Sequence, residues 1–332
     1  MRSCLMWSPG LMPCLIEDIL DKYYINISCR RNRTPFFVYR IMKKLLSTQA
    51  LLVALIMGFV LSSTMVPPVS AAEKLNSSNP SGETSSSVSP IKTIGIIGGV
   101  SWVSSLEYYR LMNQMVRDKL GGLNSAQILM YSIEFGEFSK QERLAGQGDW
   151  RPLRKIMLDA AQRLKNGGAD FIVIASNTMN SSAEDIQDKV KIPVLHIADA
   201  TGQKIKEKGL KSVILLGTKY TMESNFYRDR LEKKYGLKVI LPNQADRDYI
   251  NTVIFDELCA EKIYQASKEH FIEIINRLVK ESAAEGVILG CTEIPLLIKQ
   301  EDVRVPVFDT TAIHAEAAVA YSLGQSSEHH DK

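Results

Sequence analysis

A cysteine stands where a buried strand runs into a tight turn, near the C-terminal end of the chain. The apolar run at 287–289 predicts the strand, Gly290 predicts the turn, and Cys291 follows it. Thr292 and Glu293 then have the pattern of a helix start, and the free N–H groups of a helix N-terminus stabilise a thiolate. We therefore expect Cys291 to be a reactive thiol of depressed pKa, although a lone cysteine at a strand end is more often a buried, inert side chain.

A second copy of this layout lies earlier in the chain. Segment 169–178 again has a small residue and an apolar strand, and Ser176 stands where the cysteine stands in the later copy. Two further pairs of segments correspond: 192–196 with 305–309, and 92–98 with 211–217. The chain therefore looks like a duplicated unit, in which Ser176 and Cys291 can face each other across a cleft.

Strands and helices alternate along both copies, which predicts parallel sheets with right-handed crossovers. We expect an α/β fold of two similar domains, related by pseudo-twofold symmetry, with the active site between them. The first domain should comprise 92–198 and the second 199–306. Ligands bind at the carboxyl ends of parallel strands. The polar or small residues expected there are Gly99, Ser101, Ser176, Asn177, Thr218, Cys291 and Thr292.

Five motifs carry a family resemblance: Ile-Gly-Ile-Ile-Gly-Gly-Val-Ser-Trp at 94–102, Ser-Asn-Thr-Met at 176–179, His-Ile-Ala-Asp at 196–199, Leu-Gly-Thr at 216–218 and Leu-Gly-Cys-Thr-Glu at 289–293. From about Lys92 to Gly324 the chain resembles the aspartate/glutamate racemase superfamily of cofactor-independent amino-acid racemases. The resemblance implies two α/β domains around a cleft, with the C-terminal segment 307–325 packed back on the first domain. It also implies two opposed groups, of which one removes the α-proton of an amino acid and the other returns a proton to the opposite face.

The resemblance and the strand-end positions together suggest roles for named residues. The expected catalytic residues are Cys291, Ser176 and His196, and the expected substrate-binding residues are Gly99, Ser101, Asn177, Thr178, Thr218, Thr292 and Glu293. Removing an α-proton requires a strong base, donors that stabilise the growing negative charge, and dry surroundings. Ser, Thr and Asn also favour turns and helix caps, so each has a structural alternative. We expect no cofactor and no metal, because the chain has neither a recognisable pyridoxal-phosphate lysine motif nor a Cys/His cluster with metal-ligand spacing.

Three positions depart from the family pattern. Ser176 replaces the usual Cys or Thr, Asn180 replaces a common His, and Val103 replaces a common Glu. A serine hydroxyl is far less acidic than a thiol, so it needs a neighbouring base. His196 follows the next strand and is the candidate for that base, with a buried histidine bonded to the backbone as the alternative.

The motifs indicate the substrate and the type of reaction less clearly than they indicate the site residues. Acidic-substrate members carry a cation for the distal carboxylate in the loop after the second strand, which here spans 134–143 and offers Lys140 and Arg143. Aspartate or glutamate is therefore the default substrate. Two alternatives stay open: a decarboxylase-like relative that uses Cys291 alone, and an exported small-molecule binding protein with a degraded site.

The chain has 332 residues, 45% of them apolar, and a net charge of +3, which gives no indication of nucleic-acid binding. Three of its five cysteines precede the globular part, and Cys259 falls in a helical pattern, where we expect it to be unreactive. Ser104 and Glu107 have capping-box spacing at the start of an amphipathic helix whose Tyr109, Met112, Val116 and Leu120 share one face.

The N-terminal part predicts export. Residues 1–41 look like a mis-called or disordered extension, 42–71 have the layout of a signal peptide cleaved near Ala71, and 72–91 form a Ser-rich linker. An uncleaved signal anchor is the alternative. We expect a periplasmic or secreted homodimer that acts on a small amino acid and keeps no stable membrane span after processing, with 326–332 as a polar tail.

Overall fold

The computed structural model describes residues 91–146 and 148–325. The predicted extension 1–41, the signal peptide 42–71, nearly all of the linker 72–91 and the tail 326–332 lie outside these described residues. Among the helices that the structure does describe, none combines the length and the apolar character needed to cross a bilayer.

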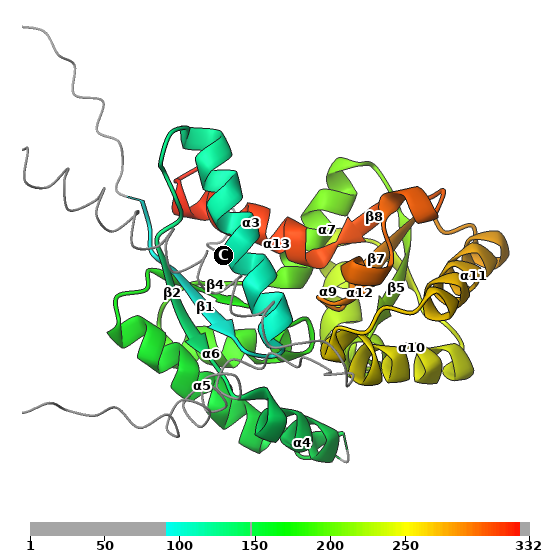
Figure 1. Cartoon of the computed structure of the whole chain (residues 1–332), viewed down its shortest axis with the longest axis horizontal. Helices are drawn as coiled ribbons and strands as arrows, with labels where there is room; N and C mark the ends of the chain where they lie inside the picture. Colours follow the sequence, from blue (N-terminus) through cyan, green and yellow to red (C-terminus); the bar gives the residue numbers. More distant parts are fainter. Residues whose placement is uncertain (1–90, 147, 326–332) are drawn as a thin grey trace, which may run out of the picture. The chain divides into compact units, whose positions relative to one another are not determined.

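The first half of the described chain forms a four-stranded parallel sheet with the strand order β2-β1-β3-β4 (Figure 1). Its elements are β1 (Ile94–Gly98), α3 (Trp102–Leu120), β2 (Ile128–Ser132), α4 (Phe135–Ala145), α5 (Arg151–Asn166), β3 (Phe171–Ile174), the 3₁₀ turn η1 (Thr178–Ser182), α6 (Ala183–Val190) and β4 (Val194–Leu195). The central strands β1 and β3 are fully buried, as expected for a parallel sheet with helices on both faces.

Strand β3 shows how an unbroken apolar run serves both faces of the sheet. Phe171 and Val173 pack in one core cluster with residues of α3 and α13, and Ile172 and Ile174 pack in another with residues of α5 and α6. Successive side chains of a strand point to opposite faces, so every position here must be apolar.

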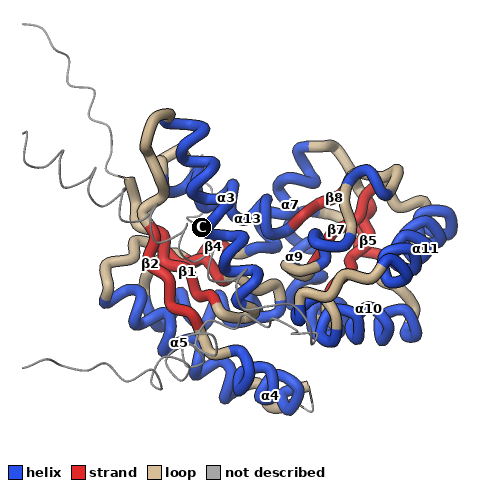
Figure 2. The backbone as a smooth tube through the Cα atoms, in the orientation of Figure 1, coloured by secondary structure: helices blue, strands red, loops and turns tan. Residues whose placement is uncertain are grey.

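The second half repeats the first, with a parallel sheet of order β6-β5-β7-β8. Its elements are α7 (Ile197–Glu207), β5 (Ser212–Gly217), α8 (Lys219–Glu223), α9 (Asn225–Tyr235), β6 (Lys238–Ile240), α10 (Gln244–Asp256), the 3₁₀ turn η2 (Leu258–Ala260), α11 (Gln265–Ser282), β7 (Gly286–Gly290), α12 (Ile294–Leu297), the 3₁₀ turn η3 (Gln300–Asp302), β8 (Val307–Asp309) and α13 (Thr310–Ser322). Equivalent strands occupy equivalent places in the two strand orders, which confirms the predicted α/β fold of two similar halves. Figure 2 shows the two groups of strands, each accompanied by helices.

The structure moves one predicted domain boundary. We assigned 307–325 to the first domain, but β8 pairs with β7, so residues 307–309 stay in the second sheet. Only α13 returns: Ala315, Ala318 and Val319 share a core with strands of the first sheet and with α3. The reason is the internal repeat itself, because β8 is the copy of β4 and completes its own sheet in the same way.

Helix α3 departs from its sequence pattern at its start. It begins at Trp102, its N-cap residue Ser101 makes no side-chain capping bond, and the Ser104 hydroxyl donates to the carbonyl of Ala175 at 2.9 Å. The predicted capping box is therefore absent. The buried side of the helix is made by Tyr108, Met112 and Val116, with Ser104 and Ser105, whereas the predicted Tyr109 and Leu120 are 51% and 44% exposed.

Gly99 shapes the turn between β1 and α3. Its φ of +85° lies in the left-handed region, and a Cβ atom there would lie 2.1 Å from the carbonyl oxygen of Ile133. Its N–H donates to the hydroxyl of Ser105 at 2.7 Å. This position therefore requires glycine for backbone geometry, and the turn carries the next residues toward the carboxyl edge of the sheet.

Candidate active site

A small cavity of about 30 Å³ lies where the loops after β1, β3, β5 and β7 meet. Both sheets contribute to its lining, as the predicted cleft requires. Such a volume holds only one or two water molecules.

Most of the predicted site residues line this one cavity. Those that do are Ser101, Ser176, Asn177, Thr178, Thr218, Cys291, Thr292 and Glu293. Gly99 and His196 do not line it. Ser176 and Cys291 enter from the ends of the corresponding strands β3 and β7, which come from different sheets.

Glu293 is the polar centre of the cavity wall. Its Oε2 accepts hydrogen bonds from the Cys291 thiol at 3.0 Å and from the Thr292 hydroxyl at 2.8 Å. Its Oε1 accepts from the Ser101 hydroxyl at 2.6 Å, a bond that joins the two halves of the chain. We expected Glu293 to contact substrate, but the structure places its carboxylate directly on the cysteine thiol.

The environment of Cys291 reverses one expectation. Burial raises the pKa of the Cys291 thiol well above its ordinary value, and the nearby carboxylate of Glu293 raises it further. The predicted helix start at Thr292 is also wrong, because α12 begins at Ile294 and is only four residues long. Without a substantial helix N-terminus, the cysteine rests as a neutral thiol that donates to a carboxylate.

Ser176 sits in a turn held by backbone contacts. Its hydroxyl accepts from the N–H of Met179 at 3.4 Å, a long bond. The carbonyl of Ser176 accepts from the Asn180 amide at 2.7 Å, and the Asn180 Oδ1 accepts from the N–H of Ile197 at 3.0 Å. Asn180 therefore ties this turn to the start of α7, which gives it a structural role.

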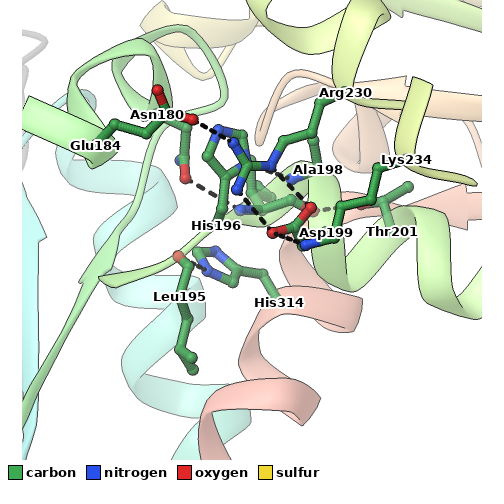
Figure 3. A network of polar contacts seen from close by, with 11 residues as sticks. Asn180, Glu184, Leu195, His196, Ala198, Asp199, Thr201, Arg230, Lys234 and His314 are labelled. Carbon is green, nitrogen blue, oxygen red and sulfur yellow. Dashed lines mark hydrogen bonds and ion pairs between the residues drawn. The ribbon is translucent and has the colours of Figure 1, made fainter. Parts of the chain in front are cut away.

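His196 does not act on Ser176 in this structure, contrary to prediction. It caps α7, and its Nδ1 accepts from the N–H of Ala198 at 3.1 Å, so the ring proton lies on Nε2 (Figure 3). Burial lowers the pKa of His196 to about 3, and the charge of Arg230 contributes. The alternative, a buried neutral histidine bonded to the backbone, is therefore the one observed.

Around His196, a buried carboxylate holds two cations (Figure 3). Arg230 donates to both oxygens of Asp199 at 2.8 and 2.9 Å, and Lys234 donates at 3.0 Å. Arg230 also reaches Glu184 on α6, at 2.8 Å. Burial by itself would raise the pKa of Asp199, but its bonds to Arg230 lower it to about 2. This network joins α6, α7 and α9, and it lies outside the cavity lining.

Asn177 has a polar atom that remains free. Its Nδ2 donates to the Thr310 hydroxyl at 3.0 Å, and that hydroxyl in turn donates to the carbonyl of Leu289. Because the Thr310 proton is used there, the amide orientation of Asn177 is set by the network. Its buried Oδ1 has no hydrogen-bond partner among the described residues. The hydroxyls of Thr178 and Thr218 pair across the two halves at 3.0 Å.

The sequence reasoning missed several lining residues: Val100, Phe135, Glu142, Ile254, Phe255, Cys259 and Gly290. Glu142 lies in segment 134–143, where the family resemblance predicts a cation and gives no signal for an acid. Lys140 and Arg143 are exposed and do not line the cavity, and Lys140 pairs with Glu137 at 3.5 Å. Thus no cation lines the cavity in the part of the chain that the structure describes.

The second cysteine also differs from expectation. Cys259 lies in η2, beyond the end of α10, and lines the same cavity as Cys291. Burial raises its pKa, and Glu293 and Glu142 contribute. Both thiols are thus neutral in the free protein. Within the described ranges, no group of three His, Cys, Asp or Glu side chains could hold a metal ion.

Comparison with known proteins agrees with this geometry. The model of the Asp/Glu/hydantoin racemase family matches residues 97–318. The broad specificity amino-acid racemase RacX of Bacillus subtilis is 28% identical over 181 residues, which cover 54% of this chain and 76% of that protein. Crystal structures of a candidate Asp/Glu racemase from Yersinia pestis and of an aspartate racemase homologue from Pyrococcus horikoshii are 47% and 38% identical, with TM-scores of 0.64 and 0.61. Each alignment covers 70% of this chain and 99% of the other. The chain belongs to the Asp/Glu/hydantoin racemase family.

Proposed function

We propose that the protein is an isomerase, a cofactor-independent amino-acid racemase in which Cys291 and Ser176 exchange the α-proton on opposite faces of the substrate. The observation that carries the proposal is that these two residues, from corresponding strand ends of different sheets, line one cavity. The named racemases among the relatives support the reaction class.

On the cysteine face, Glu293 supplies the base. The thiol already donates to Glu293 Oε2 at 3.0 Å, so the proton has a short path to the carboxylate. The thiolate then takes the α-proton. The resting pKa of the thiol is high, and a bound amino acid brings the positive charge of its ammonium group into the cavity. That charge favours the thiolate, so the base forms when substrate is present.

The polar wall of the cavity suits the two invariant groups of an amino acid. The hydroxyls of Thr178 and Thr218 can donate to the α-carboxylate, whose negative charge grows as the proton leaves, whereas the proton of Thr292 is already donated to Glu293. The partnerless Oδ1 of Asn177 is an acceptor suited to the α-ammonium. Binding of this kind leaves the α-carbon between the two acid/base groups.

The serine face is the weaker one. Ser176 has no basic side chain bonded to its hydroxyl among the described residues, and only the distant N–H of Met179 approaches it. This asymmetry favours one alternative reading, a single-thiol enzyme that protonates a planar intermediate from the Cys291 face, as a decarboxylase does. An exported binding protein is less well supported, because the bonded pair of Cys291 and Glu293 is intact.

One experiment separates these activities. The protein is incubated in D₂O with a panel of L-amino acids and with a malonate, and deuterium incorporation, optical rotation and carbon dioxide release are followed. We expect deuterium at the α-carbon with loss of optical activity. Carbon dioxide from the malonate would indicate the decarboxylase, and binding without exchange would indicate a receptor. Either of these results would overturn the racemase proposal.

Export and assembly are proposed on the sequence alone. We propose cleavage near Ala71 and release into the periplasm or the medium, which sequencing of the mature N-terminus by mass spectrometry tests. A protein retained whole in the cytoplasm would contradict it. We also propose a homodimer, for which light scattering at micromolar concentration should give twice the mass of the mature chain.

A further inference from the structure

Glu142 is a charged residue for which the proposed reaction has no use. It lies in the last turn of α4, only 3% of it is exposed, and it lines the cavity. Its carboxylate makes no hydrogen bond and no ion pair with any described residue. A buried charge is normally paired, because burial in a medium of low dielectric constant is costly. A buried carboxyl with no partner among the described residues either rests protonated or takes a positive partner, and its place on a cavity wall allows a ligand to supply that partner.

The rest of the lining suggests where that partner comes from. Phe135 follows β2, and Ile254 and Phe255 lie on α10. Their apolar surfaces suit methylene groups, and they line the same cavity as the carboxylate. No Lys, Arg or His among the described residues lines it, so no protein group is in place to neutralise a second carboxylate on a substrate.

We propose that Glu142 selects amino acids with an aliphatic side chain that ends in an ammonium group, such as lysine or ornithine, over aspartate and glutamate. The inference rests on the proposed racemase function and names its substrate class. The hydroxyls around the cysteine and serine take the α-carboxylate, Asn177 takes the α-ammonium, and Glu142 remains for the distal ammonium.

The electrostatics of the free site agree with this role. Burial and, less strongly, the charge of Glu293 raise the pKa of Glu142 to about 7, against the opposing charge of Arg143. The charge of Glu142 also raises the pKa of Tyr220 and of Cys259, after the larger effect of burial on each. An arriving cation stabilises the ionised form of Glu142, whereas an arriving carboxylate meets two buried acids and no cation.

The test compares lysine with norleucine, which has the same stem without the distal amine. The kcat/KM values for lysine, norleucine and glutamate are measured for the wild type, Glu142→Gln and Glu137→Gln. For each protein, the value for lysine is divided by the value for norleucine and by the value for glutamate. Glu137 lies on the same helix but is exposed, so its replacement is the matched control. We expect Glu142→Gln to lower kcat/KM for lysine by about 10- to 100-fold, the usual contribution of a bond to a charged group. Norleucine should change by less than about threefold, and the control should behave as the wild type.

Other outcomes count against the proposal. An equal loss for lysine and norleucine would show that Glu142 holds the α-ammonium of every substrate. A preference for glutamate that survives in Glu142→Gln would show that no distal cation is selected. Calorimetric titration of lysine is independent of turnover. If lysine binds, with loss of binding in Glu142→Gln, but no amino acid exchanges its α-proton, the racemase proposal fails while the ligand assignment stands.

Glu142→Gln is expected to fold. It removes a buried charge without a protein partner and keeps the shape of the side chain, so its thermal midpoint should equal or exceed that of the wild type. A clear drop in the midpoint together with uniform loss of activity would indicate a structural role and overturn the assignment.

Discussion

Replacing Glu293 by Gln should make the Cys291 thiol more reactive toward alkylation and should lower the rate of racemisation. The carboxylate lies 3.0 Å from the thiol, and after burial it is the next cause of the raised pKa of Cys291. A neutral amide removes the repulsion between the carboxylate and the thiolate. At this separation, with an effective dielectric constant of about 20, the repulsion is roughly 5 kcal/mol. That value is an upper bound, because the hydroxyls of Ser101 and Thr292 already share the negative charge.

The assay follows alkylation by iodoacetamide at pH 7, with peptide-level mass spectrometry to separate the two cavity cysteines. If only a third of that repulsion is realised, the thiolate fraction, and with it the alkylation rate of Cys291, rises by roughly 20-fold. Racemisation should nevertheless fall by about 10²- to 10⁴-fold, because the acceptor for the thiol proton is gone. Glu301→Gln changes an exposed carboxylate and should alter neither rate.

Two results would refute this reasoning. Alkylation of Cys291 that is unchanged or slower in Glu293→Gln would show that the carboxylate does not hold the thiol protonated. Racemisation at the wild-type rate would show that the proton leaves by another route. The rates must diverge, because a merely structural role for Glu293 would lower activity without making the thiol more reactive.

Three further predictions follow from the site and its supports. Ser176→Ala should stop racemisation yet leave the opposite thiol able to exchange the α-proton of one enantiomer with retention, seen by NMR in D₂O; full racemase activity would place the second acid/base group elsewhere. For His196, the folded pKa of about 3 lies below the ordinary 6.5, so the unfolded chain binds more protons and stability falls as pH drops from 6.5 toward 3. By pH 4.5 urea unfolding should show a loss of about 3 kcal/mol from this group. His196→Asn keeps a capping side chain and should lack that loss; an equally steep loss in the variant would refute it. Asp199→Asn leaves Arg230 without its buried partner and should cost about 3 kcal/mol, whereas Glu184→Gln, at a site 81% exposed, should cost less than about 1; equal costs would contradict the burial argument.

The fold could be predicted because its signals are local and repeated. The apolar runs of β3 and β7 are long enough to be buried on both faces, and the turn residues that follow them recur at nearly the same spacing in both halves. Parallel strands place their carboxyl ends on one edge. The meeting of Ser176 and Cys291 in one cavity therefore followed from the duplication alone, as did most of the surrounding hydroxyl groups.

The protonation chemistry could not be predicted in that way, because a pKa depends on burial and on neighbours from distant parts of the chain. Sequence position suggested a helix N-terminus at Cys291 and an active base at His196. The fold instead places a carboxylate on the thiol and buries the imidazole as a helix cap. The burial of Glu142 could not be predicted from the sequence either. In the sequence Glu142 looks like one more solvated charge on a surface helix, and only the fold buries it in a cavity wall that residues of the second half also line. The sequence by itself determined the duplicated scaffold and the position of the reacting pair, since these depend on periodicity and spacing. Tertiary structure alone decided which groups are charged there, since desolvation and Coulomb interactions depend on the distance between side chains in space.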